Sequence, residues 1–238
     1  MFHKKWELAL QLIDQARAWG LPDRIVLADA DYGDRGEFRA GLEQRSLPYA
    51  VGITSQLVVW AQPPRPRVPH RRGPGPAPKR LRYGNQAPLS VKALAQQHEA
   101  RFRQLTWREG TKGAIRSRFW AQRVQTAHHW QWGEKPGQAV WLLVEWPVGE
   151  PEPTRYFLCA LPGRLSVRRL VRVAQSRHWI EQDDQQMKEE LGLDHFEGRS
   201  WNGWHHHVTL VMLAHGFLQR ERRRRRDKSH LDAAAPAA

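Results

Sequence analysis

The chain has 238 residues, of which 40% are hydrophobic and 10% aromatic, a composition that excludes a disordered or collagen-like protein. The longest apolar run, residues 208–218, has 11 residues and contains His215, well short of the roughly 20 residues that span a bilayer, so we expect no membrane partner. Cys159 is the single cysteine, which excludes an internal disulfide and fits a reducing cytoplasm.

The net charge of +14 is concentrated in two short segments. Residues 62–84 hold seven basic residues and no acidic one, and residues 219–228 hold seven basic and two acidic ones. The rest of the chain therefore carries a net charge of only +2. A nearly neutral body with two basic segments indicates a polyanionic partner, most simply DNA or RNA, bound through counterion release at phosphates. The alternative is two solvated charge runs.

The first sixty residues show the pattern of an α/β layer. The predicted elements are, in chain order, a helix at 6–19, a strand at 24–29, a loop at 30–35, a helix at 36–46 and a strand at 49–53. This order implies that the two strands pair in parallel. The loop after Asp29 then lies at the carboxyl end of its strand, where α/β sheets tend to place ligand sites.

The pattern changes twice in the rest of the chain. Residues 62–88 are too rich in Pro and Gly for regular structure and are expected to be a linker or an excursion between strands. A small antiparallel sheet is predicted from the β-rich runs at 104–108, 115–124, 140–146 and 155–161. Helical periodicity returns at Ser166, with a possible break near Gln175, and ends at Gly192. A last helix at 201–218 runs into the basic tail.

The helix that follows Gln175 carries the most specific pattern in the chain. Glu181 and Lys188 fall about 40° and about 20° from Arg177 around the helix axis, so all three share one face. An acid between two bases on a helix is most often an ordinary surface salt-bridge ladder. The alternative is a catalytic acid with basic companions, which the context supports.

That context is the run Val-Leu-Ala-Asp at residues 26–29, followed by Tyr32 and Gly33 and, after a β-rich insertion, by the Arg, Glu, Lys helix. Together these features resemble the DDE transposases of bacterial insertion sequences. The resemblance extends over nearly the whole chain to Leu218, including LADADYGDRGEFRAGL, TWREGTKGAIRSRF and RHWIEQDDQQMKEELGLDHFEGRSWNGWHHHVTLVMLAHGFL. It implies an α/β fold, a partial RNase H-like core with a β-rich insertion between the second and third catalytic carboxylates.

In this family three carboxylates hold two divalent metal ions, expected to be Mg²⁺, that cleave DNA ends and join them to a target. By motif, Asp29 looks like the second carboxylate and Glu181 the third, and both are therefore expected metal ligands. Arg177 and Lys188 look like basic companions that bind DNA phosphate. Ala174 stands where many relatives have tyrosine, and Asp31 where many have glycine, so Asp31 is either an outer-shell group or drift.

The first carboxylate has no counterpart, since the family places it on a strand before the helix at 6–19. We therefore expect a carboxyl-terminal transposase fragment, incomplete as an enzyme. Its expected divisions are the amino-terminal part of the core at 1–60, a basic Pro-rich linker at 61–98, the β-rich insertion at 99–163, a helical return to the core at 164–218 and a basic disordered tail at 219–238.

Double-stranded DNA is the expected partner, joined by an upstream chain or an intact transposase that supplies the missing strands. The expected location is the bacterial cytoplasm, at the nucleoid. The alternative function is a non-catalytic DNA-binding regulator or competitor of an intact transposase, because the two basic segments at 62–84 and 219–228 are independent of the acids.

Overall fold

The computed structural model describes residues 2–69, 74, 80–83, 87–110, 113–163 and 165–234. The chain forms two compact units, Met1–Arg177 and His178–Ala238. Within the expected linker, the basic residues Arg71, Arg72 and Lys79 lie outside the described residues. In the described part of the chain, no helix has both the length and the apolar character that crossing a membrane requires.

The first unit begins with the predicted alternation of helices and strands, with one addition. Its first elements are α1 (Lys5–Ala18), β1 (Val26–Ala28), α2 (Ala30–Gly33), α3 (Gly36–Gln44) and β2 (Tyr49–Ile53). The addition is α2, a short helix inside the loop predicted at 30–35. The parallel pairing of β1 with β2 is confirmed, with Leu27 opposite Ala50.

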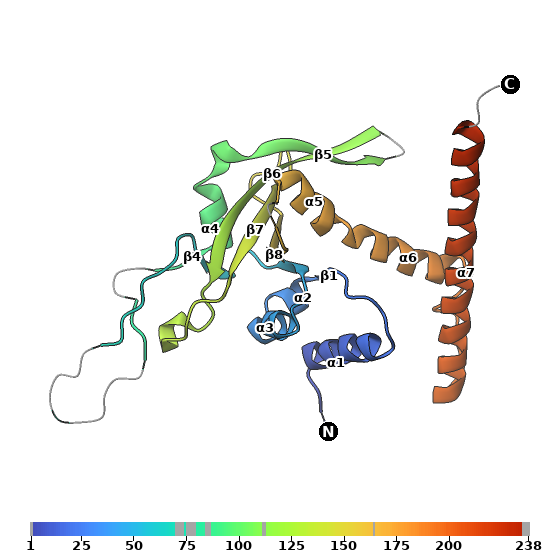
Figure 1. Cartoon of the computed structure of the whole chain (residues 1–238), viewed down its shortest axis with the longest axis horizontal. Coiled ribbons are helices and arrows are strands. Elements are labelled where there is room, and N and C mark those ends of the chain that lie inside the picture. The colour runs from blue at the N-terminus through green and yellow to red at the C-terminus, as the bar shows by residue number, and fades with distance from the viewer. Residues whose placement is uncertain are drawn as a thin grey trace. The chain divides into compact units, whose positions relative to one another are not determined.

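The remaining strands of this unit extend the same sheet. They are β3 (Val58–Trp60), β4 (Leu89–Ser90), β5 (Arg103–Gly110), β6 (Gly113–Thr126), β7 (Ala139–Trp146) and β8 (Arg155–Ala160). The strand order is β1-β2-β8-β7-β6-β3-β4, with β5 paired to β6. The fold is therefore mixed α/β and compatible with an RNase H-like DDE core, as expected (Figure 1).

The four β-rich runs are strands with antiparallel pairing, but they do not form a small sheet of their own. β8 pairs antiparallel with β2, so that Val51 lies opposite Leu158 and the insertion continues the sheet of the core. The reason is burial. Tyr49 and Val51 are almost completely buried on one face of β2 and Ala50 on the other, and a strand covered on both faces is typical of the interior of a sheet, where both edges are paired.

Two elements lie inside the range expected to be a linker, residues 61–98. They are β4 and α4 (Val91–Gln96). Ser90 caps α4, because its Oγ accepts the N–H of Ala93 at 3.1 Å. Leu94 and Ala95 are then completely buried in the core. The structured part of the insertion therefore begins before the expected boundary at residue 99.

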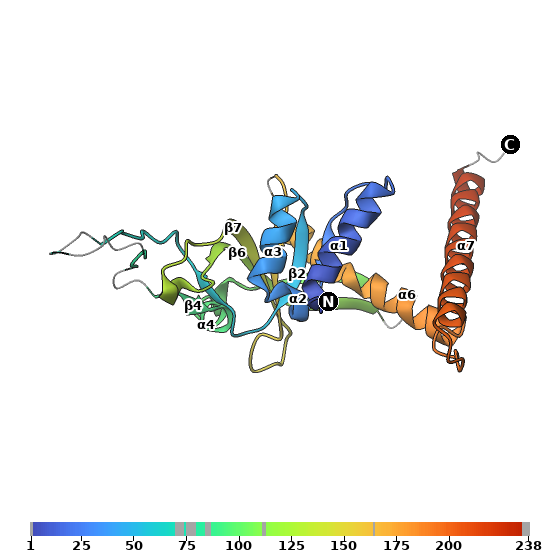
Figure 2. The same cartoon turned by 90° about the horizontal axis from the view of Figure 1, so that it is seen from below.

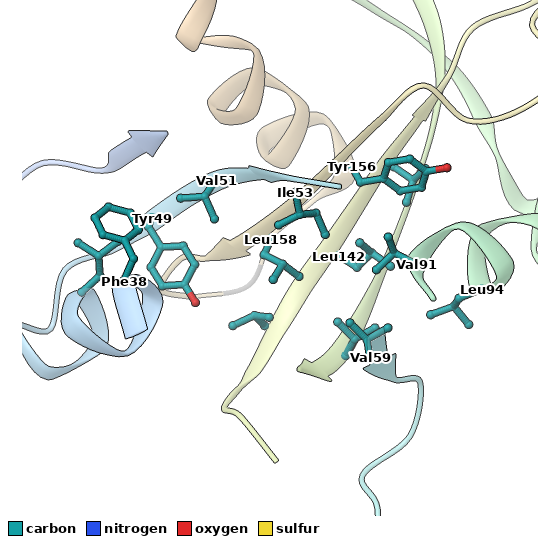
Figure 3. Packing of buried hydrophobic residues seen from close by; sticks show 14 of the residues in the cluster. Phe38, Tyr49, Val51, Ile53, Val59, Val91, Leu94, Leu142, Tyr156 and Leu158 are labelled. Atoms are coloured by element: carbon teal, nitrogen blue, oxygen red, sulfur yellow. The ribbon is translucent and has the colours of Figure 1, made fainter. Parts of the chain in front are cut away.

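The two faces of the sheet carry separate cores. Tyr49, Val51 and Ile53 of β2 face the larger core, which contains side chains of α1, α3 and α4 (Figure 3). Ala50, between them, faces the smaller core beneath α5 (Val167–Gln175). This alternation is the period-two geometry of a strand. Figure 2 shows α1 and α3 side by side, where Arg45 of the α3 carboxyl end binds Asp14 of α1 through two hydrogen bonds.

The β5–β6 hairpin reaches beyond the sheet as a two-stranded ribbon (Figure 1). β6 pairs with β7 only from Arg118 onward, whereas its pairing with β5 continues to Gly113. Residues 113–117 of β6 therefore have β5 as their only strand neighbour among the described residues.

The second unit contains α7 (Trp201–Ala234) and all of α6 (Arg177–Glu189) except its first residue. His215 of α7 lies 3.5 Å from Asp183 of α6, and Arg222 donates a hydrogen bond to Gln186 at 2.9 Å. The break predicted near Gln175 and the end at Gly192 are confirmed, since Gly192 has a φ of 68°.

Of the predicted basic tail, residues 219–234 continue the helix α7. The sequence reason is its content of Arg, Lys, Glu and Ala, which are all strong helix formers. Gln219 and Arg222 also contact α6, which stabilises the first turn of the predicted tail.

Candidate active site

Asp29 lies immediately after β1, at the carboxyl end of the two parallel strands, and begins α2 as its N-cap. Its Oδ1 accepts the backbone N–H of Asp31 at 3.1 Å, a typical N-cap hydrogen bond of an aspartate. The Asp29 side chain remains 40% exposed. A carboxylate thus stands in solvent at the edge of the sheet where α/β folds place ligands.

Arg177 is the residue that the structure brings to Asp29. Its Nη2 lies 3.8 Å from Oδ2 of Asp29, and the two side chains are about equally exposed, at 39% and 40%. An ion pair this exposed adds little to stability, on the order of 0–1 kcal/mol. Its main effect is on the geometry of the site, because it positions the guanidinium of Arg177 beside the exposed carboxylate of Asp29.

A buried polar contact fixes the end of α5, two residues before Arg177. Gln175 donates through Nε2 to Oε2 of Glu145 at 2.9 Å, and both residues are buried. Arg155 approaches the same carboxylate oxygen at 3.9 Å. Glu145 belongs to β7, so this contact ties the carboxyl end of α5 to the sheet. Leu170, which is completely buried, holds the middle of the helix on the same face.

The other acids near Asp29 each have a structural partner. Asp31 lies 3.2 Å from Nζ of Lys5, and this hydrogen bond raises the pKa of Lys5. Asp34 accepts the backbone N–H of Thr54 at 2.9 Å, which joins the end of α2 to the end of β2. The sequence pattern gave no signal for Lys5 or Thr54, because each comes from an element distant in sequence.

A cavity of about 270 Å³ lies next to this edge of the sheet. Its lining consists of Asp34, Arg39, Thr54, Gln56, Leu57, Val58, Thr126 and His128. Arg39 is only 4% exposed, donates a hydrogen bond to the carbonyl of Gly33, and has a pKa lowered by burial. Burial also lowers the pKa of His128, so this half-buried ring is neutral near pH 7. Sequence reasoning missed this buried cation beside the site.

Glu181 and Lys188 lie on α6, as the periodicity predicts. Glu181 is exposed. Lys188 binds Asp184 through its Nζ at 2.7 Å, and this hydrogen bond raises the pKa of Lys188. Both residues belong to the second unit. Within the described ranges, no group of three or more His, Cys, Asp or Glu side chains is arranged to hold a metal ion, so the joint role of Asp29 and Glu181 stays a prediction.

In a comparison with known proteins, one family model matches the amino-terminal part of the chain. No curated protein matches the sequence. A family model described as DDE superfamily endonuclease matches residues 1–114, a range that contains Asp29 and all elements from α1 to β5 but not Arg177 or Glu181. Residues 1–114 are therefore similar to the DDE superfamily of endonucleases.

Proposed function

We propose that this chain acts in DNA transposition as part of a DDE transposase, cutting and joining double-stranded DNA in the bacterial cytoplasm with the help of divalent metal ions. Asp29 serves as the second and Glu181 as the third carboxylate. The observation that carries the proposal is the position of Asp29, at the carboxyl end of a parallel strand inside the matched range, with Arg177 at 3.8 Å.

The donor chemistry of Asp29 fits a hard divalent cation. One of its oxygens accepts a backbone N–H, and the other faces the cationic Arg177 and is therefore oriented toward positive charge. Members of the superfamily generally use divalent ions, and Mg²⁺ favours one or two carboxylates together with water. When bound, such ions supply an activated nucleophile and stabilise the leaving oxygen. Asp29 and Glu181 would hold them.

The remaining proposed roles belong to the basic side chains of α6. Arg177 and Lys188 bind the phosphate next to the scissile bond and offset its charge as it grows in the transition state. The guanidinium of Arg177 suits this task because it presents several N–H donors in one plane to phosphate oxygens. Its pairing with Asp29 places the side chain beside the carboxylate in the absence of DNA.

The resemblance assigns only two of the three family carboxylates to this chain, and one structural feature agrees with a further strand. β1 is the first strand in the sheet order, and in the described part of the chain only β2 pairs with it. We propose that the active form includes a strand bearing the first carboxylate along the open edge of β1. Exposed apolar side chains of α1, such as Leu8 and Leu12, are further surface for such a segment.

The test of this function is a cleavage reaction supplemented with the strand that carries the first carboxylate, taken from an intact family member. Mg²⁺-dependent cutting of duplex DNA is expected, and Asp29→Ala or Glu181→Ala should each abolish it. Asp184→Ala is the matched control on α6, because it removes a carboxylate that binds only Lys188 among its described contacts. If the Glu181 variant cuts as fast as the Asp184 variant, Glu181 is not a catalytic carboxylate.

A second prediction concerns DNA binding by the tail. Deleting residues 223–238 removes Arg223–Arg226 but keeps Arg222, which contacts Gln186. The slope of log affinity against log salt should become shallower by about 3.6 units, at about 0.9 for each of the four arginines that loses a phosphate contact. Arg223→Lys with Arg225→Lys is the control and should keep the slope, since it keeps the charge.

The tail experiment also bears on the alternative function. A non-catalytic regulator or competitor is favoured by the exposed basic side chains of α7, such as Arg223 and Arg225, which need no carboxylate to bind DNA. Salt-sensitive binding without any cleavage in the supplemented reaction would favour the regulator. An unchanged slope after the deletion would instead exclude the tail as a DNA contact.

A further inference from the structure

Two adjacent cavities lie between β5 and α5, on the face of the sheet that carries the smaller core. One of about 460 Å³ is lined by Gln104, Leu105, Thr106, Trp107, Arg168, Val171 and Arg172. The other, of about 360 Å³, is lined by Arg101, Arg103, Leu105, Phe119, Trp120, Ala121, Val167 and Arg168. They share Leu105 and Arg168, so together they form one continuous groove, here named the β5–α5 groove.

The charge of this groove has one sign. Four arginines line it, Arg101, Arg103, Arg168 and Arg172, and no acidic residue does. All four are exposed. Among the ion pairs between described residues, none joins these four to a carboxylate. Four cations that line one groove with no acidic residue among its lining produce a positive potential that attracts a polyanion.

The backbone explains why the arginines converge. Arg103 pairs directly with Phe119, and residues opposite each other in an antiparallel pair point to the same face. Phe119 lies in the core beneath α5, so Arg103 points to that face as well. Arg168 and Arg172 are four residues apart on α5, which places them on one side of the helix and about 6 Å apart along its axis.

The groove also leads toward Asp29. α5 ends at Gln175, whose contact with Glu145 fixes that end to β7. Arg177 follows two residues later and lies 3.8 Å from Asp29. Arg168, Arg172 and Arg177 thus lie along one course of the chain, from the groove to the carboxylate.

We propose that the β5–α5 groove binds the phosphodiester backbone of one strand of a DNA duplex and guides it to Asp29. The inference deepens the proposed function, on which it rests. The ligand is a phosphodiester because guanidinium groups match phosphate oxygens and counterion release rewards several contacts at once. The duplex is favoured over a single strand because the β5–β6 ribbon extends past the groove, and a two-stranded ribbon fits the major groove of B-DNA.

The test measures affinity for a mixed-sequence DNA duplex between about 50 and 200 mM salt, in EDTA so that no cleavage occurs. Arg168→Gln with Arg172→Gln should make the log-log slope shallower by about 2 units, since each lost phosphate contact removes about 0.9. Gln keeps a high helix propensity, so α5 should remain folded.

The matched control is Arg24→Gln with Lys135→Gln, which removes the same charge elsewhere. Lys135 is exposed in the loop before β7, at the other end of that strand from Glu145, whereas Arg24 is exposed and precedes the amino end of β1, away from Asp29. The control should keep the slope of the unmodified chain. With a single-stranded probe, the salt slopes of the two double variants should differ less than with duplex DNA.

Equal slopes for the groove variant and the control would overturn the proposal, because the effect would then follow net charge alone. A larger difference in slope between the two double variants with single-stranded DNA than with duplex DNA would also overturn the proposal. The outcome is separable from that of the proposed function. The salt slope of the groove variant is measured without catalysis. If that slope becomes shallower as expected but the Asp29 and Glu181 variants still cut DNA, the groove proposal stands and the catalytic assignment fails.

Discussion

Duplex DNA is expected to stay intact when the 238-residue chain is incubated alone with Mg²⁺ or Mn²⁺. The proposed site assigns two carboxylates, Asp29 and Glu181, to this chain. A two-metal reaction also needs a bridging carboxylate that holds both ions for in-line displacement. Loss of one electrostatic contact of this kind costs on the order of 10²–10³ in rate, and a missing bridging ligand costs more because it also misplaces the ions. The measurement is nicking of a supercoiled plasmid over time.

Metal-dependent nicking by the chain alone, lost on Asp29→Ala, would contradict this expectation and point to a local acid in the bridging role. Asp31 and Asp34 are the nearest in sequence, and each already has a partner, Lys5 and the N–H of Thr54 respectively. Asp31→Ala and Asp34→Ala would then separate them, because only the acid that bridges the ions would abolish nicking.

Local sequence patterns predicted the elements around Asp29 well. The compact apolar runs of β1 and β2 and the amphipathic periodicity of α1 are properties of neighbouring residues, which is the information that such patterns carry. The parallel pairing followed because helices alternate with these strands. The helical break before Arg177 could also be predicted, since periodicity is lost at that point in the chain.

Pairing between distant segments could not be predicted in the same way. β2 pairs with β8 so that Val51 lies opposite Leu158, and the sequence near either residue does not specify its partner. The same limit applies to the site. Lys5 and Asp31 are 26 residues apart, and Arg177 meets Asp29 two residues after the Gln175–Glu145 contact that ties the end of α5 to the sheet. The resemblance to a family suggested the proposed roles of Asp29 and Arg177, whereas only the structure shows their contact.

Gly33→Ala is expected to destabilise the first unit strongly and to displace Asp29. A Cβ at Gly33 would lie 1.9 Å from the carbonyl oxygen of Gly52, closer than any real contact, and the obstacle is the backbone of β2 rather than a flexible side chain. Overpacking of this kind costs about 3 kcal/mol or more. The thermal midpoint should therefore fall by roughly 6–12 °C, at about 2–4 °C per kcal/mol for a domain of this size.

Gly52→Ala is the matched control, because it adds the same methyl group to the other side of this contact. A Cβ at Gly52 would meet its nearest atom, the N of Ala30, at 3.4 Å, which is ordinary van der Waals distance. Its midpoint should stay within about 4 °C of the unmodified chain. Since α2 begins at Asp29, a shift of this helix away from β2 also moves the carboxylate relative to Arg177, and Gly33→Ala should lose activity in the supplemented cleavage reaction while Gly52→Ala keeps it. Equal midpoints for the two variants would mean that α2 does not pack on β2 as closely as this contact requires.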